Sequence, residues 1–421
     1  MKRSILLIAM IAAGCGGSSG KGNGGGGGGS AGGGGTAGGG GTLTTGIAVI
    51  DSDYKSTAVS LVDPSTATLS KDDCIDSGAV SSTLSMALSG DVVLATGKQA
   101  NGELVLLDRT NSALDYLSAS ATGCTVLRQV SVGTFYANPH DVVSISATKS
   151  YVTSNEPNPS GGAAATNDQG DDIIIIDPTA GTITGHIDLS TYADSAAVLP
   201  RPDRATLANG LVYVVLNENS EDLKTNVDGR IVIIDPTTDT VTGKIDLTGL
   251  VGCGGLDYWA ATKTLAVGCS GDYNATLATE LTESALVLID VSGATPTIAK
   301  TIPASALGSR PISSQNFVFA GDNLIVASTY GDFTTTTSFD ALWAVTLDAG
   351  TAVKITDADA AGDFAGLVYL PTTKQVLATD SSATTPVVRV LDVSNPAAVT
   401  QTATFDADPK AALQPRQIAW F

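Results

Sequence analysis

A run of apolar residues that ends in aspartate recurs along the whole chain. The two clearest copies, Ile173–Asp177 and Ile231–Asp235, are made almost entirely of isoleucine and valine before the aspartate. The seven copies occupy residues 59–63, 104–108, 173–177, 231–235, 286–290, 343–348 and 388–392. A repeat of several dozen residues, rich in β-branched side chains, is typical of a β-propeller or a solenoid.

Each repeat predicts four antiparallel strands, here called a, b, c and d. In the fourth repeat these are Pro202–Ala208, Leu211–Leu216, Arg230–Asp235 and Thr240–Leu247. The apolar run forms strand c, and Asp235-Pro236 begins the c–d turn, because aspartate bonds the backbone two residues on and proline fixes the next φ. The recurring aspartate is therefore predicted to form turns rather than to carry chemistry.

The c strands are continuously apolar, which is typical of a strand buried on both faces. A ring in which each sheet lies between two others buries both faces, whereas a two-sheet sandwich would alternate more strongly. The sequence therefore predicts an all-β fold, a seven-bladed β-propeller over residues 47–421. The seven units run over residues 47–77, 79–132, 138–190, 200–249, 252–304, 310–358 and 362–408.

The first unit lacks a strand a, since only a glycine-rich segment precedes Ile47. Its other strands are predicted at Ile47–Asp53, Thr57–Asp63 and Thr66–Cys74. The C-terminal segment Leu413–Phe421 matches strand a of the other units. Pairing this segment into the first blade would remove two free sheet edges, so we expect the C-terminal strand to close the ring.

Two b strands begin with similar sequence motifs, Tyr151–Asn155 and Tyr213–Asn217, and each is followed further on by Ile-Asp-Pro-Thr. These motifs resemble the YVTN-type repeats of bacterial seven-bladed propellers. That group includes surface-layer and lipoprotein propellers and lies near lactonase-like and quinoprotein-like ones. The resemblance implies the fold, and only weakly an activity.

The N-terminus has the features of an export signal. Lys2 and Arg3 precede an apolar run, Ile5–Ala13, that is too short to span a bilayer. The following Gly14-Cys15 makes residues 1–14 resemble a bacterial lipoprotein signal peptide, which implies lipid on Cys15. The alternative is an ordinary secretory signal in which Cys15 is incidental. Gly16 in place of aspartate favours the outer membrane, with either the periplasm or the cell exterior as the side the protein faces.

Residues 15–46 begin with Cys15 and are then nearly all glycine, serine and threonine, so they cannot bury apolar surface. We expect a disordered tether with an end-to-end distance on the order of 30 Å. The formal charge of the chain is −20, which excludes a nucleic-acid partner, because such proteins present basic faces. The expected membrane association is through the lipid anchor alone.

Four cysteines remain in this exported chain, so disulfides are expected. Cys253 and Cys269 lie almost symmetrically about a predicted hairpin turn at residues 261–263, where opposed positions can come within disulfide range. Cys74 and Cys124 pair by elimination. A Cys–His metal site is not predicted, because no CxxC motif occurs.

The d–a connections align on a proline and carry polar residues that the ring would gather at the mouth of its channel. Arginines there could bind a carboxylate or phosphate, and His140 is the best candidate general base, although Asp141 beside it should point to the opposite face. The alternative is that these residues join adjacent blades. The candidates are Asn138, His140, Asp141, Arg201, Asp203, Arg204, Arg310 and Arg416.

The b–c loops are long and acidic, and they cover residues 155–172, 217–228, 272–283 and 332–340. Their oxygen atoms could bind calcium, with Asp171, Asp172, Glu218 and Asp228 as candidate ligands, although none has the regular spacing of a known calcium loop. Solvated charge is the alternative. No other cofactor is predicted.

Three functions remain open from the sequence. The first is a lipid-anchored cell-envelope scaffold that binds a protein or glycan partner through its acidic loops without catalysis. The second is a lactonase-like or lyase-like enzyme that uses His140 at the channel mouth. The third is a structural protein of a surface layer, bridged by calcium.

Overall fold

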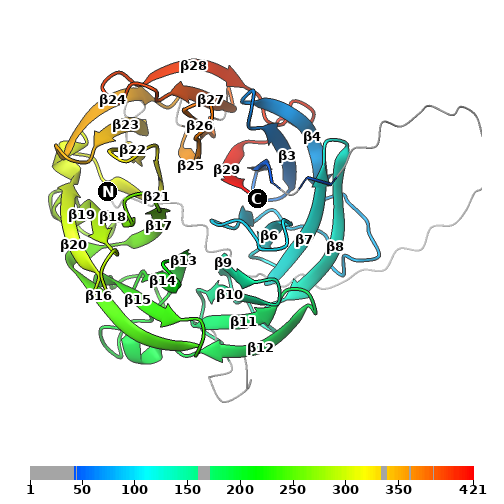
Figure 1. Cartoon of the computed structure of the whole chain (residues 1–421), viewed down its shortest axis with the longest axis horizontal. Helices are drawn as coiled ribbons and strands as arrows, with labels where there is room; N and C mark the ends of the chain where they lie inside the picture. Colours follow the sequence, from blue (N-terminus) through cyan, green and yellow to red (C-terminus); the bar gives the residue numbers. More distant parts are fainter. Residues whose placement is uncertain (1–41, 44, 160–170, 333–338, 360–361, 383) are drawn as a thin grey trace, which may run out of the picture.

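The computed structural model describes residues 42–43, 45–159, 171–332, 339–359, 362–382 and 384–421. They form seven antiparallel sheets arranged as blades around a central channel (Figure 1). The prediction of a seven-bladed β-propeller is therefore confirmed. The predicted signal peptide, Cys15 and most of the predicted tether lie outside the described residues. Within the described part of the chain, no helix has the length and apolar character needed to cross a membrane.

The strands of each blade are consecutive in the chain, apart from β29 in blade one and β1 in blade two. Blade one contains β2 (Ile47–Ser52), β3 (Thr57–Asp63), β4 (Thr68–Asp76) and β29 (Pro415–Trp420), and blade two contains β1 (Thr42–Leu43), β5 (Val92–Leu94), β6 (Leu104–Asp108), β7 (Ala113–Ser120) and β8 (Gly123–Ser131). Blade three contains β9 (Pro139–Ser146), β10 (Lys149–Ser154), β11 (Ile173–Asp177) and β12 (Thr182–Ile187), and blade four contains β13 (Pro202–Ala208), β14 (Leu211–Leu216), β15 (Asp228–Asp235) and β16 (Thr240–Val251). Blade five contains β17 (Cys253–Trp259), β18 (Thr264–Ser270), β19 (Ser284–Asp290) and β20 (Thr297–Pro303), and blade six contains β21 (Ile312–Phe319), β22 (Leu324–Thr329), β23 (Ala341–Thr346) and β24 (Thr351–Asp357). Blade seven contains β25 (Phe364–Leu370), β26 (Gln375–Asp380), β27 (Val387–Asp392) and β28 (Thr400–Phe405), and the short helices are η1 (Ser190–Tyr192), α1 (Leu277–Thr282) and η2 (Ala304–Ala306).

The C-terminal strand closes the ring as predicted. β29 pairs antiparallel with β2, and Ile47 lies opposite Trp420. Beyond the strand ends, the backbone N–H of Gly46 donates to Phe421 (3.1 Å), and the N–H of Phe421 donates back to Gly46 (3.0 Å). Blade one is thus built from the first and last segments of the propeller.

The turn role of the repeated aspartate is confirmed in several blades. The carboxylate of Asp235 accepts the backbone N–H of Thr237 (2.8 Å), and Asp177 accepts that of Thr179 (2.9 Å). Hydrogen bonds from Ser292 lower the pKa of Asp290 in the same way. These aspartates hold the c–d turn of their own blade.

Blade two departs from the predicted arrangement. Its apolar run, β6, is the second strand of the blade and not the third, because the short β5 occupies the innermost position. The upstream segment that would have supplied strand a lies against the outermost strand instead, where Thr83 donates to the carbonyl of Val126 (2.7 Å). The additional strand β8 completes the blade on its outer side.

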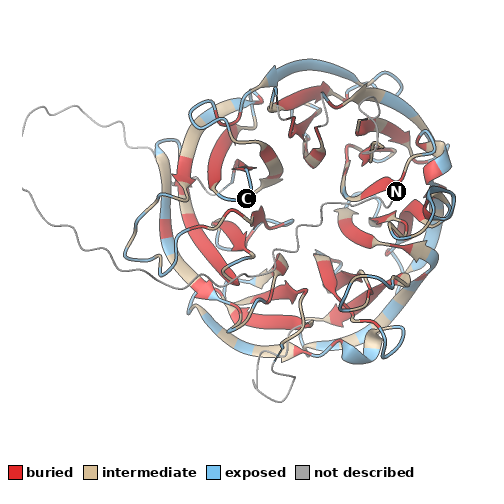
Figure 2. Ribbon diagram, turned by 180° about the vertical axis from the view of Figure 1, so that it is seen from behind, coloured by how far each residue is buried: buried red, intermediate tan, exposed pale blue. Residues whose placement is uncertain are grey.

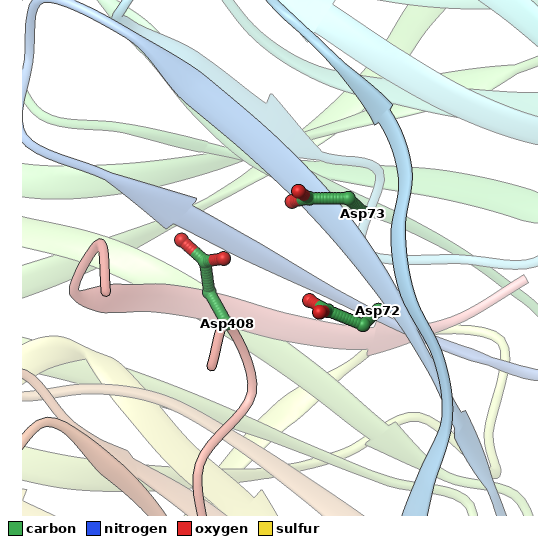
Figure 3. Close-up of side chains that lie close together, drawn as sticks. All are labelled: Asp72, Asp73 and Asp408. Carbon is green, nitrogen blue, oxygen red and sulfur yellow. The ribbon is translucent and has the colours of Figure 1, made fainter. Parts of the chain in front are cut away.

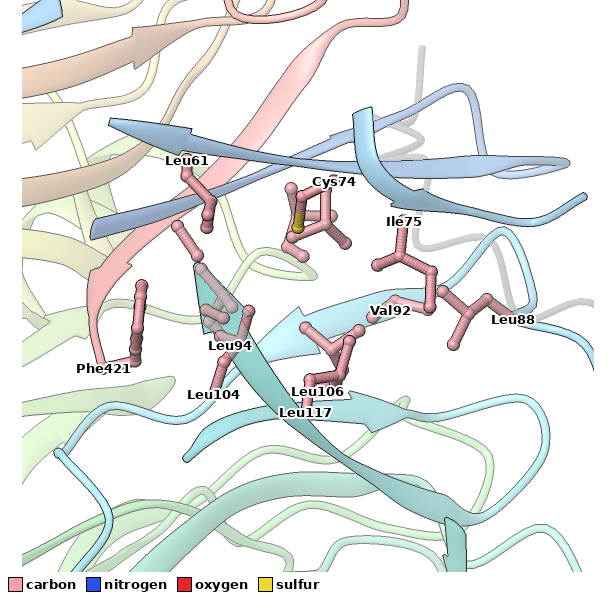
Figure 4. Packing of buried hydrophobic residues seen from close by; sticks show 14 of the residues in the cluster. Leu61, Cys74, Ile75, Leu88, Val92, Leu94, Leu104, Leu106, Leu117 and Phe421 are labelled. Atoms are coloured by element: carbon pink, nitrogen blue, oxygen red, sulfur yellow. The ribbon is translucent and has the colours of Figure 1, made fainter. Parts of the chain in front are cut away.

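Burial follows the radial position of each strand (Figure 2). The c strands β11 and β15 are buried along almost their whole length, whereas the outer strand β28 is almost fully exposed and the outer strand β12 is partly exposed. Each of the seven interfaces between adjacent blades holds its own apolar cluster. Figure 4 shows the cluster between blades one and two, which includes Leu61, Leu104 and Phe421. Seven separate cores therefore hold the ring.

Both predicted disulfides are present. Cys253 and Cys269 are opposite each other on β17 and β18 and join one hairpin. Cys74 and Cys124 join β4 to β8, the outermost strands of blades one and two. The second bond links two blades at a point far from the channel.

Candidate functional site

The residues before the d–a prolines lie between loops of adjacent blades. Asn138 and Arg201 both adopt the left-handed conformation, with φ of 48° and 47°. The guanidinium of Arg201 is buried, and it makes an ion pair with Glu156 (2.8 Å) and a hydrogen bond to the carbonyl of Glu221 (3.3 Å). Arg201 therefore joins the b–c loops of blades three and four rather than facing the channel.

Two of the other three predicted arginines, Arg310 and Arg416, also join loops. Arg310 donates to the carbonyl of Phe339 (2.6 Å) within blade six. Arg416 donates to the carbonyl of Ser52 in blade one (3.3 Å) and to the hydroxyl of Ser381 in blade seven (3.2 Å). The structure thus does not bring Arg201, Arg310 and Arg416 together with His140.

Three of the predicted residues do form one group, on the inner strands β9 and β13. The Nδ1 atom of His140 lies 2.9 Å from a carboxylate oxygen of Asp203. The Nη1 atom of Arg204 donates to the carbonyls of His140 (2.8 Å) and Leu94 (3.2 Å). Burial alone would raise the pKa of Asp203, but the charge and hydrogen bond of His140, with Arg204 and Gln315, lower it below its usual value.

Asp141 faces away from this group, as the strand alternation predicts. Its carboxylate accepts the backbone N–H groups of Thr96 and Val142 (both 2.9 Å) and of Ala205 (3.0 Å). Burial raises its pKa. Asp141 therefore connects the inner strands of blades three and four to the residues that follow β5, which is a structural role.

Two glutamine residues of the channel were not recognised in the sequence. The amide of Gln315 donates to both carboxylate oxygens of Asp203 (3.0 and 2.8 Å), and Gln417 accepts the backbone N–H of Leu94 (2.7 Å). The side chain of Asp203 lies against Gly254, where a Cβ atom would be 2.8 Å from the carboxylate of Asp203. A glycine at this position lets blades four and six meet across blade five.

Beside this polar group lies a cavity of about 400 Å³. It is lined by the central and C-terminal parts of the inner strands and by Pro371 in the a–b turn of blade seven. The cavity therefore occupies the half of the channel next to the a–b turns, whereas the sequence predicted a site at the end next to the d–a connections. The polar lining residues include Arg204, Gln315, Asn316 and Gln417.

Aromatic side chains surround the outer part of this cavity. Trp259 stacks on Phe319 with ring centroids 6.0 Å apart, and its indole N–H donates to Asp322 (2.7 Å). The indole N–H of Trp420 donates to the carbonyl of Tyr369 (2.9 Å). The aromatic residues that line the cavity are Tyr258, Trp259, Phe317, Phe319, Tyr369 and Trp420. Because hydrogen bonds fix both indoles, the rings are ordered before any ligand arrives.

The candidate calcium ligands of the b–c loops are engaged with protein groups. Asp171 accepts the N–H of Arg201 (2.7 Å), Asp228 accepts that of Gly249 (2.9 Å), and Glu218 lies 3.0 Å from Arg230. Asp172 is buried. Parts of two of the loops, residues 160–170 and 333–338, are outside the described residues. In the described part of the chain, the group of carboxylates close enough to hold a metal ion is a different one, Asp72, Asp73 and Asp408.

Buried loop carboxylates should make stability depend on pH. Burial raises the pKa of Asp340 to about 8, with a further contribution from the charge of Asp363. The unfolded chain loses this proton near the ordinary pKa, while the folded chain keeps it, so stability falls as pH rises from about 4 to 8. Asp340→Asn keeps the acceptor for the N–H of Gly331 (2.8 Å) and should remove most of this fall, on the order of 5 kcal/mol. Urea unfolding at several pH values measures the effect, and an identical pH dependence in the variant would contradict it.

Comparisons with known proteins give the fold and no family. No family model matches the chain, and no curated protein matches its sequence. A Bacteroides uniformis protein provisionally assigned as a 6-phosphogluconolactonase matches with a TM-score of 0.57 and 13% identity over 90% of this chain and 99% of that one. A second protein so assigned, from Bacteroides fragilis, has a TM-score of 0.53 and 10% identity over 90% and 97% of the two chains. The Cps50 (Swd1) propeller domain of Myceliophteria thermophila has a TM-score of 0.52 and 11% identity over 83% and 98%.

Proposed function

We propose that the protein is a lipid-anchored β-propeller of the bacterial cell envelope that binds a glycan in its central cavity without transforming it. The anchor at Cys15 and the outer-membrane location rest on the N-terminal sequence. The binding role rests on the aromatic cavity, whose volume lies in the range of small-molecule sites. In this proposal the cavity takes the place of the acidic b–c loops as the binding surface.

The chemistry of the cavity favours a sugar. A sugar ring has an apolar C–H face that can stack on an aromatic ring and a rim of hydroxyl groups that both donate and accept hydrogen bonds. Trp259 and Trp420 supply flat apolar faces, and the amides of Gln315 and Gln417 supply donors and acceptors nearby. Among the contacts of the described residues, the hydrogen bonds of Arg204 are made by Nη1, which leaves Nε and Nη2 for a ligand hydroxyl.

A second candidate function, lactone hydrolysis, is favoured by the contact between His140 and Asp203. In such a reaction His140 would accept a proton from water while the water oxygen bonds the carbonyl carbon. The ring C–O bond then breaks and the proton passes to the ring oxygen. The carboxylate of Asp203 would orient the imidazole. The binding proposal is preferred because three of the four arginines expected beside His140, namely Arg201, Arg310 and Arg416, join loops of the blades instead.

Tryptophan fluorescence provides a direct test of glycan binding. Two of the three tryptophans of the chain line the cavity, so a bound sugar should change the emission. We expect saturable changes with at least one member of a panel of bacterial and plant hexasaccharides, and Trp259→Ala should weaken its affinity at least tenfold, about 1.4 kcal/mol. Trp343→Phe, in β23 outside the cavity, is the matched control and should bind as the unmodified chain does.

The same preparations separate the two candidate functions. Gluconolactone, with and without a 6-phosphate, is the substrate probe for hydrolysis, and His140→Gln is its variant. If the unmodified chain hydrolyses the lactone and His140→Gln does not, while the variant keeps the same melting temperature, the enzymatic proposal replaces the binding proposal. Saturable glycan binding without lactone turnover supports the binding proposal, and no response to any sugar would overturn it.

A further inference from the structure

Three carboxylates lie together on the outer side of blade one. Asp72 and Asp73 belong to β4, and Asp408 belongs to the connection from blade seven (Figure 3). One carboxylate oxygen from each lies within 4.8 Å of the others. Asp408 lies more than 330 positions from Asp72 and Asp73 in the sequence, and ring closure brings the three together.

A fourth carboxylate, Asp51 on β2, is directed toward the same place. Asp51 is fully buried, and among the described residues neither of its oxygens has a hydrogen-bond partner. It shares the strand face of Ile47 and Val49, which pack in the same cluster as Ala407. The carboxylate of Asp51 therefore projects to the side of the blade on which Asp408 lies. An ionised carboxylate without a partner is costly to bury, so a cation bound beside Asp51 would stabilise its charged form.

The carboxylates are held in place by the backbone. Asp408 is buried, and its oxygens accept the N–H groups of Ala411 (3.0 Å) and Leu413 (2.8 Å). Asp73 lies in a β-bulge of β4, where its own N–H donates to the hydroxyl of Ser60 (3.2 Å). The side chain of Asp73 is only 7% exposed. These oxygens are thus fixed close together instead of separating in solvent.

The protein supplies little positive charge to this group. Lys410 lies 2.6 Å from one oxygen of Asp73, but its side chain is 65% exposed. The amino group of Lys71 bonds the backbone carbonyl of Asp72 (2.9 Å) rather than a carboxylate. The other oxygen of Asp73 and one oxygen of Asp72 are buried without a hydrogen-bond partner among the described residues.

We propose that Asp51, Asp72, Asp73 and Asp408 bind one calcium ion that joins blade one to the connection from blade seven. The ligands are all carboxylate oxygens, which hard cations prefer, and no nitrogen or sulfur ligand of the kind zinc prefers is part of the group. Calcium is favoured over magnesium because it accepts irregular geometry and several protein oxygens. The ion would lie next to the strand pairing that closes the ring.

Calorimetric titration of the full chain with calcium chloride, after removal of metal with EDTA, tests the site. One ion should bind per chain, and the melting temperature should rise by about 4 °C at a calcium concentration 100-fold above Kd. Magnesium should produce a smaller shift. Asp51→Asn and Asp408→Asn should each weaken calcium binding at least tenfold.

The behaviour without metal distinguishes a calcium ligand from a residue that only supports the fold. In EDTA, Asp51→Asn should melt at the same temperature as the unmodified chain or higher, since it removes a buried charge. Asp228→Asn, which changes a carboxylate of a b–c loop, is the control and should keep the full calcium response. Absence of a calcium effect on the unmodified chain, or an undiminished effect in both cluster variants, would overturn the proposal.

Discussion

Removal of residues 413–421 is expected to prevent formation of a stable ring. The deletion removes β29, exposes the backbone edge of β2 and opens the apolar clusters on both sides of blade one. Truncation of one buried aromatic residue costs about 3–5 kcal/mol, and the whole folded state is usually stable by only about 5–15 kcal/mol. We therefore expect an aggregated chain, or one without a cooperative unfolding transition by circular dichroism.

A single substitution provides a milder form of the same experiment. Phe421 is buried, and its ring lies against Gly46, where a Cβ atom would be 2.6 Å from it. Phe421→Ala should lower stability by about 3–5 kcal/mol in urea unfolding. Leu413→Ala, just outside β29, is the control and should cost much less. A deletion variant that still melts within a few degrees of the full chain would show that closure contributes little.

Loss of the disulfide between Cys74 and Cys124 is expected to have the next largest effect. This bond connects positions separated by 50 residues and links two blades. The chain-entropy model gives about 4 kcal/mol for a loop of this length. The double variant Cys74→Ala, Cys124→Ala should therefore unfold at a clearly lower urea concentration.

The second disulfide provides the comparison. Cys253 and Cys269 are separated by 16 residues within one hairpin, for which the same model gives about 3 kcal/mol. Because this bond lies within one hairpin, in which β18 also pairs with β19, its removal breaks no covalent link between blades. The expected order of stability is the unmodified chain, then the hairpin variant, then the inter-blade variant. The reverse order would contradict an inter-blade role for Cys74 and Cys124.

Much of the fold could be predicted from local sequence. The apolar runs ending in aspartate gave the c strands and their turns in six blades, because burial on both faces and turn chemistry act over a few residues. The missing first strand and the matching C-terminal segment together predicted closure. The symmetric positions of Cys253 and Cys269 predicted their bond for the same local reason.

The remaining features depend on contacts between distant segments. In blade two, the side chain of Gln129 binds the backbone of Ser85 and Met86 and holds this segment against the outer strand β8. No local sequence pattern indicates that the segment lies there instead of forming the innermost strand. The prolines of the d–a connections predicted a site at one end of the channel. The aromatic cavity is formed instead at the other ends of the inner strands, which carry no shared motif. Asp51 lies in an ordinary strand pattern, and only the folded ring gathers Asp72, Asp73 and Asp408 into one group on the outer side of the same blade.

The place at which the chain joins the ring has a mechanical consequence. Upstream of Gly46 the two-residue strand β1 pairs with β7 of blade two, and downstream the chain continues directly into β2, which is paired with β29 on one side and with β3 on the other. Tension applied through an attached N-terminus would act along β2, across hydrogen bonds that are perpendicular to the strand. Two rows of bonds would then share the load in shear, so the ring should resist a pulling force better than if its first segment were an edge strand that could peel away.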